Sequence, residues 1–315
     1  GGCRRTGPAA SIQPAPAEAA GSEPAWPIAC RDAHLRETGA ADSWSALRAI
    51  GADGAEVFVK SDLSCEYLYA GEDRFSIADP AAVRDLGRRF ADHGLRITAF
   101  CLPNRFDERK DDEIAFTLKV AEVAAALDVP AVRIDVVSRA IADEQEFLDF
   151  AVGVGRRLVE GSAGSRVRFG VENHGRTTNK PEFLRRLFAG VDSRRFGLTL
   201  DTANFYWFGH PLSSLYDIYA EFAPRACHTH AKSICYPESE RDQQRTVGWE
   251  YGKYCCPVYE GDIDFHKVVT ILRGADFTGD LCIENESLGR FPAEQRADIL
   301  KKEVEHLRRA VAAAR

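Results

Sequence analysis

Four segments of the sequence combine an alternating apolar pattern with acidic or imidazole side chains near their ends. They are RFGVENH, GLTLD, ACHTHAK and DLCIENE, which begin at residues 168, 197, 226 and 280. Successive side chains of an extended strand point to opposite faces, so the polar residues of each segment share one face. Carboxylates and imidazoles bind divalent metals and carry protons in acid–base catalysis. The candidate residues are Glu172, Asp201, His230 and Glu284.

The spacing of these candidates indicates a repeating β/α chain. The steps from 172 to 201 and from 201 to 230 are both 29 residues, whereas the step from 230 to 284 is 54 residues. A strand, a loop and a helix together take about 30 residues. The longer last step therefore indicates an insertion over residues 233–261. We expect the four candidates at the C-terminal ends of parallel strands, where α/β barrels carry their chemistry.

Eight strand–helix units follow one another along the chain. Helix starts are indicated by residues that favour N-caps or first turns, such as Asp42, Asp79 with Pro80, and Pro181. This alternation predicts an α/β fold, a (β/α)8 TIM barrel forming a single domain over residues 26–315. A doubly wound open sheet is the competing fold, but no GxGxxG motif follows the first predicted strand. The predicted strands are 27–35, 54–59, 95–102, 131–137, 168–174, 195–201, 226–232 and 280–286. The predicted helices are 42–50, 79–93, 112–127, 144–159, 181–190, 212–223, one within 261–272 that is capped near Asp262 or Asp264, and 291–311.

Composition restricts the class of protein and its partners. The chain has 315 residues and is 45% hydrophobic, which is enough for a large core. Its formal net charge of −7 argues against a nucleic-acid partner, because phosphate binding needs clustered Lys and Arg. No run of about 18 apolar residues predicts a transmembrane segment. The sequence is compatible with a homo-oligomer.

Residues 1–25 differ in composition from the rest of the chain. They are rich in Ala, Pro, Gly and Ser, a composition that cannot bury a core and that predicts a flexible linker. Gly1, Gly2 and Cys3 are similar to the end of a bacterial lipoprotein signal, in which the Cys is lipidated, although the hydrophobic region that precedes such a Cys is missing. An arbitrary chain start explains them equally well. Export, either to the periplasm or to a lipid anchor at Cys3, and a cytoplasmic location both stay open.

The physical environment of the four candidates favours a bound cation. Inward-facing barrel positions normally hold Val, Ile or Leu, and buried carboxylates there would repel one another unless a cation joined them. Three carboxylates and one imidazole suit Mn²⁺, Mg²⁺ or Co²⁺, and they also allow Zn²⁺.

Each candidate also has a simpler interpretation. Glu172 alone would be explained by a buried ion pair with Arg133 or Lys232, and Asp201 alone by a cap on the following segment. Neither explains why all four lie at strand ends. Two further polar residues are expected to have other roles: His228 as a hydrogen-bonded residue below the ligands, and Glu286 as a solvated loop charge.

Four motifs, VENHG, LDTANF, HTHAKS and GDLCIENE, resemble the metal-binding strands of the xylose isomerase-like TIM barrels. This group contains sugar (phosphate) isomerases and epimerases as well as apurinic/apyrimidinic endonucleases, and the resemblance covers about residues 27–312. It implies that one divalent metal, with Mn²⁺ favoured, is bound by Glu172, Asp201, His230 and Glu284. Asn204 stands where many members have His, and no His-x-Asp or Asp-x-His follows His230, so the trinuclear zinc site of the endonucleases is not expected.

The resemblance implies a metal-dependent isomerase or epimerase of a sugar or keto-sugar, a small-molecule carbohydrate. Glu172 and Glu284 would remove and return the proton of an enediolate mechanism. A lyase or dehydratase on a keto-sugar or keto-glycoside is the alternative, since the same enediolate can expel a β-substituent. An endonuclease-like hydrolase and a sugar-binding module without catalysis are more remote. The residues expected to hold substrate oxygens are Arg133, His174, Asn204 and Lys232.

The insertion 233–261 is expected over the mouth of the barrel, because it follows the seventh strand. Its aromatic residues would pack against the C–H surfaces of a sugar. A loop that packs only on its neighbours or contacts a second subunit is the alternative. The cysteines of the insertion would also allow a disulfide bond if the protein is exported. The aromatic residues are Tyr236, Trp249, Tyr251, Tyr254 and Tyr259, and the cysteines are Cys235, Cys255 and Cys256.

Overall fold

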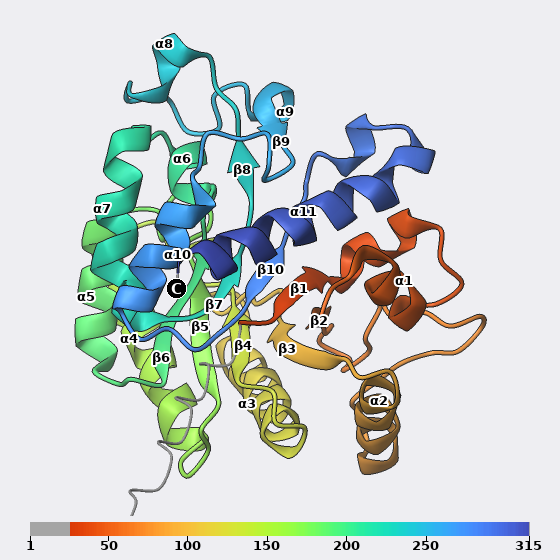
Figure 1. Cartoon of the computed structure of the whole chain (residues 1–315). Coiled ribbons are helices and arrows are strands. Elements are labelled where there is room, and N and C mark those ends of the chain that lie inside the picture. Colours follow the sequence, from red (N-terminus) through yellow and green to blue (C-terminus); the bar gives the residue numbers. More distant parts are fainter. Residues whose placement is uncertain (1–25, 315) are drawn as a thin grey trace, which may run out of the picture.

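Parallel pairing joins eight strands in the order β10-β1-β2-β3-β4-β5-β6-β7 in the computed structural model, which describes residues 26–314. A parallel bridge between Ala231 and Ile283 brings the two ends of this sheet together, so the barrel is nearly closed (Figure 1). The predicted single-domain (β/α)8 barrel is therefore confirmed. The strands are β1 (Ile28–Arg31), β2 (Gly54–Phe58), β3 (Arg96–Cys101), β4 (Ala131–Ile134), β5 (Arg168–Glu172), β6 (Phe196–Asp201), β7 (Ala226–His230) and β10 (Leu281–Ile283).

The predicted flexible linker over residues 1–25 lies outside the described residues, as does Cys3, where a lipid anchor was left open. Within the described part of the chain, every helix is too short or too polar to cross a bilayer.

Helices surround the barrel and begin where the sequence indicates. The side chain of Asp79 accepts hydrogen bonds from two backbone N–H groups of the first turn of α2, and Asp264 does the same for α10. These side chains satisfy donors that have no partner within the helix. The larger helices are α1 (Ser43–Ile50), α2 (Pro80–Asp92), α3 (Lys110–Ala126), α4 (Glu144–Gly161), α5 (Pro181–Val191), α7 (Leu212–Phe222), α10 (Phe265–Gly274) and α11 (Ala293–Ala313).

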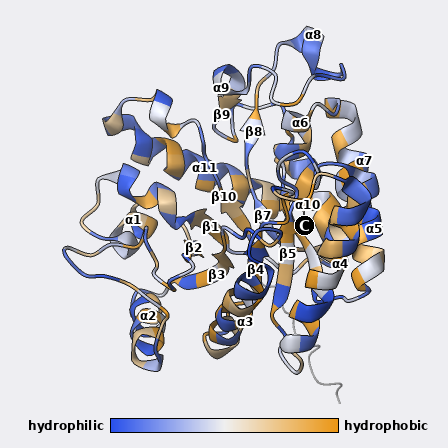
Figure 2. Cartoon of the chain, turned by 180° about the vertical axis from the view of Figure 1, so that it is seen from behind, coloured by the Kyte–Doolittle hydropathy of each residue, from blue (hydrophilic) through white to orange (hydrophobic). Residues whose placement is uncertain are grey.

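The core fills the layer between the strands and the helices. Helix α5 shows the pattern: Phe183, Leu184, Leu187 and Phe188 are buried at the spacing of one helix face. Figure 2 shows hydrophobic residues concentrated on the strands, whereas hydrophilic residues recur along the outer helices. The interior of the barrel differs, because several of its inward-facing positions carry charged side chains.

Several strands end earlier than predicted. The predicted strand 27–35 stops at Arg31 and continues as a 3₁₀ helix, Asp32–Thr38. Predicted strands 168–174 and 280–286 stop at residues 172 and 283. Beyond these points side chains replace the strand partners: the N–H of His174 donates to Thr178 Oγ1 at 2.8 Å, and that of Asn285 donates to His34 Nε2 at 3.1 Å.

The insertion contains secondary structure that the sequence did not predict. A short antiparallel pair of strands, β8 (Ser233–Ile234) and β9 (Cys255–Cys256), closes the base of the insertion (Figure 1). Between these strands in the sequence come two short helices, α8 (Glu238–Arg241) and α9 (Tyr251–Tyr254). A further short helix, α6 (Asn204–Phe208), follows β6 directly. All eight cysteines of the described residues are free thiols, so the structure has no disulfide in the insertion.

A buried glutamate connects α11 to the insertion and to the segment after β10. Glu303 is 1% exposed. Its Oε1 accepts from the N–H of Val258 at 2.9 Å, and its Oε2 accepts from Asn285 Nδ2 at 3.0 Å. Burial raises the pKa of Glu303 to about 7.

This raised pKa predicts a pH-dependent contribution to stability. The folded state holds the Glu303 proton more tightly than the unfolded chain does, so the contribution is complete below the unfolded pKa, about 4.3. It is lost as the pH rises through about 7. We expect Glu303→Gln to gain melting temperature relative to the wild type between pH 5 and pH 8. Melting curves at several pH values measure this difference, and a difference that stays constant with pH would contradict the assignment.

Candidate metal centre

Four buried side chains meet at the C-terminal ends of β5, β6 and β7 and just beyond β10. One ligand atom from each lies within 4.8 Å of all the others, and each residue is at most 4% exposed. Parallel pairing places Asp201 opposite His230. The Nδ1 of His230 lies 3.3 Å from Glu172 Oε1 and 3.5 Å from Glu284 Oε2. The structure therefore brings together all four predicted ligands: Glu172, Asp201, His230 and Glu284.

Cationic side chains hold two of the carboxylates in their ionised form. Burial by itself would raise the pKa of Glu172, but the guanidinium of Arg133, which forms an ion pair with it, holds that pKa well below its usual range. Burial acts on Glu284 in the same way, and the nearby Lys232 and Arg31 lower its pKa by more. Both glutamates are thus carboxylates at neutral pH despite their burial.

Asp201 has weaker compensation. Lys232 Nζ lies 2.9 Å from its Oδ2 and also 2.9 Å from Glu284 Oε2. Burial outweighs this ammonium and raises the pKa of Asp201 to about 7. Its other oxygen, Oδ1, accepts from the N–H groups of Ala203 and Asn204 at 2.8 Å each, so Asp201 also caps the segment that follows β6. The capping role and the position in the cluster are compatible, because they use different oxygens.

His230 provides the test of whether a cation fits. Burial would lower the pKa of its imidazole, but Glu56, Glu284 and Glu172 raise it well above 6.5. Within the described residues its Nδ1 is buried without a hydrogen-bond partner, although two carboxylates face it. A buried polar atom normally has a partner. Three carboxylates and this nitrogen are the donor set of a divalent ion such as Mn²⁺, Mg²⁺, Co²⁺ or Zn²⁺, so the residues fit a metal.

A cavity of about 360 Å³ lies above the cluster, and all four residues expected to hold substrate line it. These residues also contact neighbouring side chains. Asn204 Nδ2 donates to Glu172 Oε1 at 3.1 Å, and His174 Nδ1 lies 2.9 Å from Asp135 Oδ1. The lining residues are Arg31, Arg133, Glu172, His174, Asn204, Trp207, Lys232, Tyr251, Glu284 and Glu286.

Only one of the five aromatic residues that were expected to cover the cavity lines it. Of the five aromatic residues, Tyr251 lines the cavity, and its hydroxyl donates to Glu286. Tyr236, Trp249 and Tyr254 instead pack against one another, with ring centroids 5.7 Å apart in each pair. For these three residues the alternative interpretation, a loop packed on its neighbours, describes the structure.

Glu286 and Tyr259 also differ from expectation. Glu286 is half-exposed, as expected of a loop charge, but it also lines the cavity and lies 3.6 Å from Lys232 Nζ. Tyr259 lies beside His306 of α11, in another depression of the surface.

Sequence reasoning missed three residues that act on this site. Arg31 at the end of β1 pairs with Glu284, Glu56 on β2 contacts His230, and Trp207 of α6 lines the cavity. The signal for Glu56 was present, because a glutamate in the middle of the apolar strand segment GAEVFV needs a buried partner. The sequence gives no corresponding signal for Trp207.

Comparison with known proteins identifies the family of the chain. The family model described as xylose isomerase-like TIM barrel matches residues 44–310. The chain therefore belongs to the xylose isomerase-like TIM barrel family. A search of curated proteins finds no match to the sequence.

Solved structures show the same fold at low identity. A xylose isomerase-like TIM barrel protein from Mycobacterium smegmatis in complex with magnesium is 15% identical, with a TM-score of 0.65 over 91% of this chain and 98% of that chain. The IolI protein with a binding zinc atom is 18% identical, with a TM-score of 0.67 over 89% and 98%. A 3-keto-D-glucoside 4-epimerase from E. coli in its apo form is 14% identical, with a TM-score of 0.60 over 88% and 98%.

Proposed function

We propose that this protein is a divalent-metal-dependent isomerase or epimerase of a sugar or keto-sugar. The observation that carries the proposal is the buried cluster itself, in which three carboxylates and an imidazole nitrogen without a hydrogen-bond partner lie within 4.8 Å. In this proposal Glu172, Asp201, His230 and Glu284 bind one ion, with Mn²⁺ as the first candidate. Similar structures carry magnesium or zinc, and one is an epimerase of a keto-glucoside, which supports both parts of the proposal.

The ion would act as a Lewis acid on a carbonyl and a neighbouring hydroxyl of the substrate, which makes the adjacent C–H bond more acidic. Glu172 and Glu284 then move the proton. They come from β5 and from the segment after β10, with β6 and β7 between them in the sheet, so they can act on a substrate from two directions. Removal by one glutamate and return by the other, on the opposite face of the carbon, inverts a stereocentre.

The cations beside these glutamates also have a role in the proposal. Arg133 and Lys232 lower the pKa of Glu172 and Glu284, and a carboxylate with a low pKa is a weak base. Both cations line the cavity, where substrate oxygens would compete for their N–H groups. When Arg133 turns from Glu172 to a substrate oxygen, the basicity of Glu172 rises as the substrate arrives. His174 and Asn204 supply further hydrogen bonds at the same wall.

The cavity suits a carbohydrate for a simple chemical reason. Its polar lining presents many N–H donors to hydroxyl and carbonyl oxygens, while Trp207 and Tyr251 present aromatic surfaces to C–H groups.

The first experiment is deuterium exchange. The protein is incubated in D₂O with Mn²⁺ and a panel of keto-sugars and 3-keto-glycosides, and mass spectrometry follows deuterium next to the carbonyl. Uptake into an intact sugar skeleton supports the isomerase or epimerase, whereas loss of a β-substituent would show the lyase outcome. No exchange with any member of the panel, at full metal occupancy, would count against proton transfer.

Two substitutions test the proton-transfer residues. We expect Glu172→Gln and Glu284→Gln each to lower kcat by about 10²-fold or more, because an amide oxygen still binds a metal but cannot accept a proton. Glu113→Gln is the matched control, since Glu113 is also buried but hydrogen-bonds Asn104 and belongs neither to the cluster nor to the cavity lining. Near wild-type rates in either test variant, with the metal bound, would show that the assignment is wrong.

Metal binding should also release protons. The metal-free protein keeps a proton on His230 at neutral pH, because its pKa is raised well above 6.5, and Asp201 titrates at about 7. An ion must displace these protons, so its affinity falls as the pH drops from 7 to 5. Titration calorimetry of Mn²⁺ at pH 6, in two buffers of different ionisation enthalpy, measures the release. Equal heats in the two buffers would mean that these residues do not bind the ion.

A further inference from the structure

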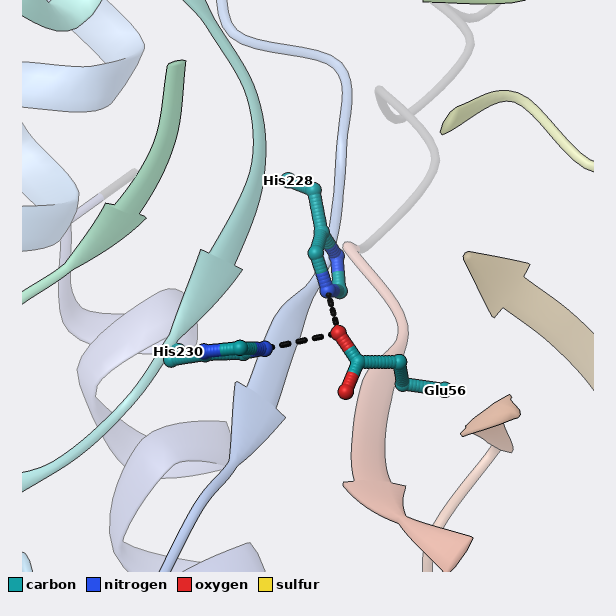
Figure 3. Close-up of side chains that lie close together, drawn as sticks. All are labelled: Glu56, His228 and His230. Atoms are coloured by element: carbon teal, nitrogen blue, oxygen red, sulfur yellow. Dashed lines mark hydrogen bonds and ion pairs between the residues drawn. The ribbon is translucent and has the colours of Figure 1, made fainter. Parts of the chain in front are cut away.

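One buried glutamate contacts two histidines of β7. Glu56 on β2 is 1% exposed, and His228 and His230 are fully buried. The Nε2 atoms of both histidines lie 2.6 Å from the same oxygen, Oε2 of Glu56 (Figure 3). The rings of His228 and His230 approach this oxygen from different directions (Figure 3). In the proposed function Glu56 neither transfers a proton nor contacts the substrate.

The distances identify these contacts as hydrogen bonds and argue against a second ion. Ligand atoms bound to a metal at about 2.0–2.2 Å lie more than about 3 Å from one another in tetrahedral geometry. Each nitrogen is only 2.6 Å from Glu56 Oε2, which is the length of a short charge-assisted hydrogen bond. Both histidines therefore direct Nε2–H at Glu56. His228 is held from its other side as well, because its Nδ1 lies 2.7 Å from Asp280 Oδ1.

This contact decides which nitrogen of His230 faces the cluster. Since Nε2 is used by Glu56, Nδ1 is the atom directed at Glu172 and Glu284, at 3.3 and 3.5 Å. An imidazole whose second N–H is held by a carboxylate has a fixed ring orientation and a more basic free nitrogen. Without Glu56 no contact at Nε2 would fix the orientation of the ring. The ring would then be free to rotate, and either nitrogen could face the cluster.

The other carboxylate oxygen of Glu56 contacts Arg31, which in turn pairs with Glu284 of the cluster. Its Oε1 lies 2.8 Å from Arg31 Nε, and the same guanidinium pairs through Nη1 with Glu284. One carboxylate thus contacts two members of the cluster, His230 directly and Glu284 through Arg31. These contacts join β1, β2 and β7, which are distant in sequence.

We propose that Glu56 is the positioning residue of the metal centre: it holds His230 with Nδ1 toward the ion and, through Arg31, holds Glu284 in place. This inference rests on the proposed function, because it assigns Glu56 to the same metal site. Glu56 does not itself bind the metal or contact the substrate. Its effect is on metal affinity and on the geometry of the ligands.

The test compares Glu56→Gln with Glu113→Gln. Glutamine has the same shape, but its neutral amide cannot accept from two histidines and Arg31 as a carboxylate does. We expect the Kd for Mn²⁺, measured by calorimetry, to rise by about 10- to 100-fold in Glu56→Gln, and the Co²⁺ absorption spectrum to change. Glu113→Gln, which also alters a buried glutamate, should bind both ions like the wild type. An unchanged Kd and spectrum in folded Glu56→Gln would overturn the proposal.

A measurement on the wild-type protein decides the matter even if Glu56→Gln does not fold. In ¹⁵N-histidine-labelled protein loaded with Zn²⁺, we expect Nδ1 of His230 to carry the metal and Nε2 to keep its proton. Metal on Nε2, or two ions per chain with one bound to Glu56, would overturn the proposal.

The two proposals fail in different ways. A wild-type protein that binds no divalent ion would contradict the proposed function, and the positioning role with it. A wild-type protein that binds one ion, with the same Kd in Glu56→Gln, would contradict the positioning role alone.

Discussion

The mouth of this barrel concentrates negative charge on side chains that are almost fully buried. Glu172, Asp201 and Glu284 lie within 4.8 Å of one another's ligand atoms and are nearly inaccessible to solvent. Removing one carboxylate from water costs several kcal/mol, unless cations or hydrogen bonds replace the lost hydration. The rest of the site can be understood as the means of compensating this charge.

The compensation comes from two directions. Arg31, Arg133 and Lys232 each pair with at least one carboxylate of the cluster, and in the proposed function a divalent ion completes the balance. These cations line the cavity, so they can also contact a substrate. Two residues, Arg133 and Lys232, therefore belong both to the groups that offset the buried charge and to those proposed to bind sugar oxygens. In the proposed function, a substrate that recruits these cations would change the charge balance at the glutamates and so couple substrate binding to proton transfer.

Much of this arrangement could be predicted from the sequence, for physical reasons. Strand alternation shows that Glu172 and Asp201 face the interior, and the regular spacing shows that they lie on successive strands. In a barrel, successive strands carry their C-terminal ends to one mouth, so the cluster follows from local patterns alone.

What the sequence could not show is pairing between distant strands. Glu56 and His228 are 172 positions apart, and a strand pattern shows the face of a residue but not its partner. Arg31 was missed for the same reason. The insertion was located correctly, but the sequence did not show which of its aromatic residues lines the cavity, because strand and helix patterns do not describe how a loop packs. The strand ends after β5 and β10 were placed too late, because side chains there replace backbone partners.

The number of metal ions bound per chain tests the proposed metal centre most directly. Dialysed protein is equilibrated with Mn²⁺, and bound metal is measured by mass spectrometry in the wild type and in His230→Ala. A centre built from the four residues binds one ion per chain in the wild type and loses it in the variant, which keeps its fold by circular dichroism. Three ions per chain, or one ion retained with unchanged affinity by His230→Ala, would contradict such a centre.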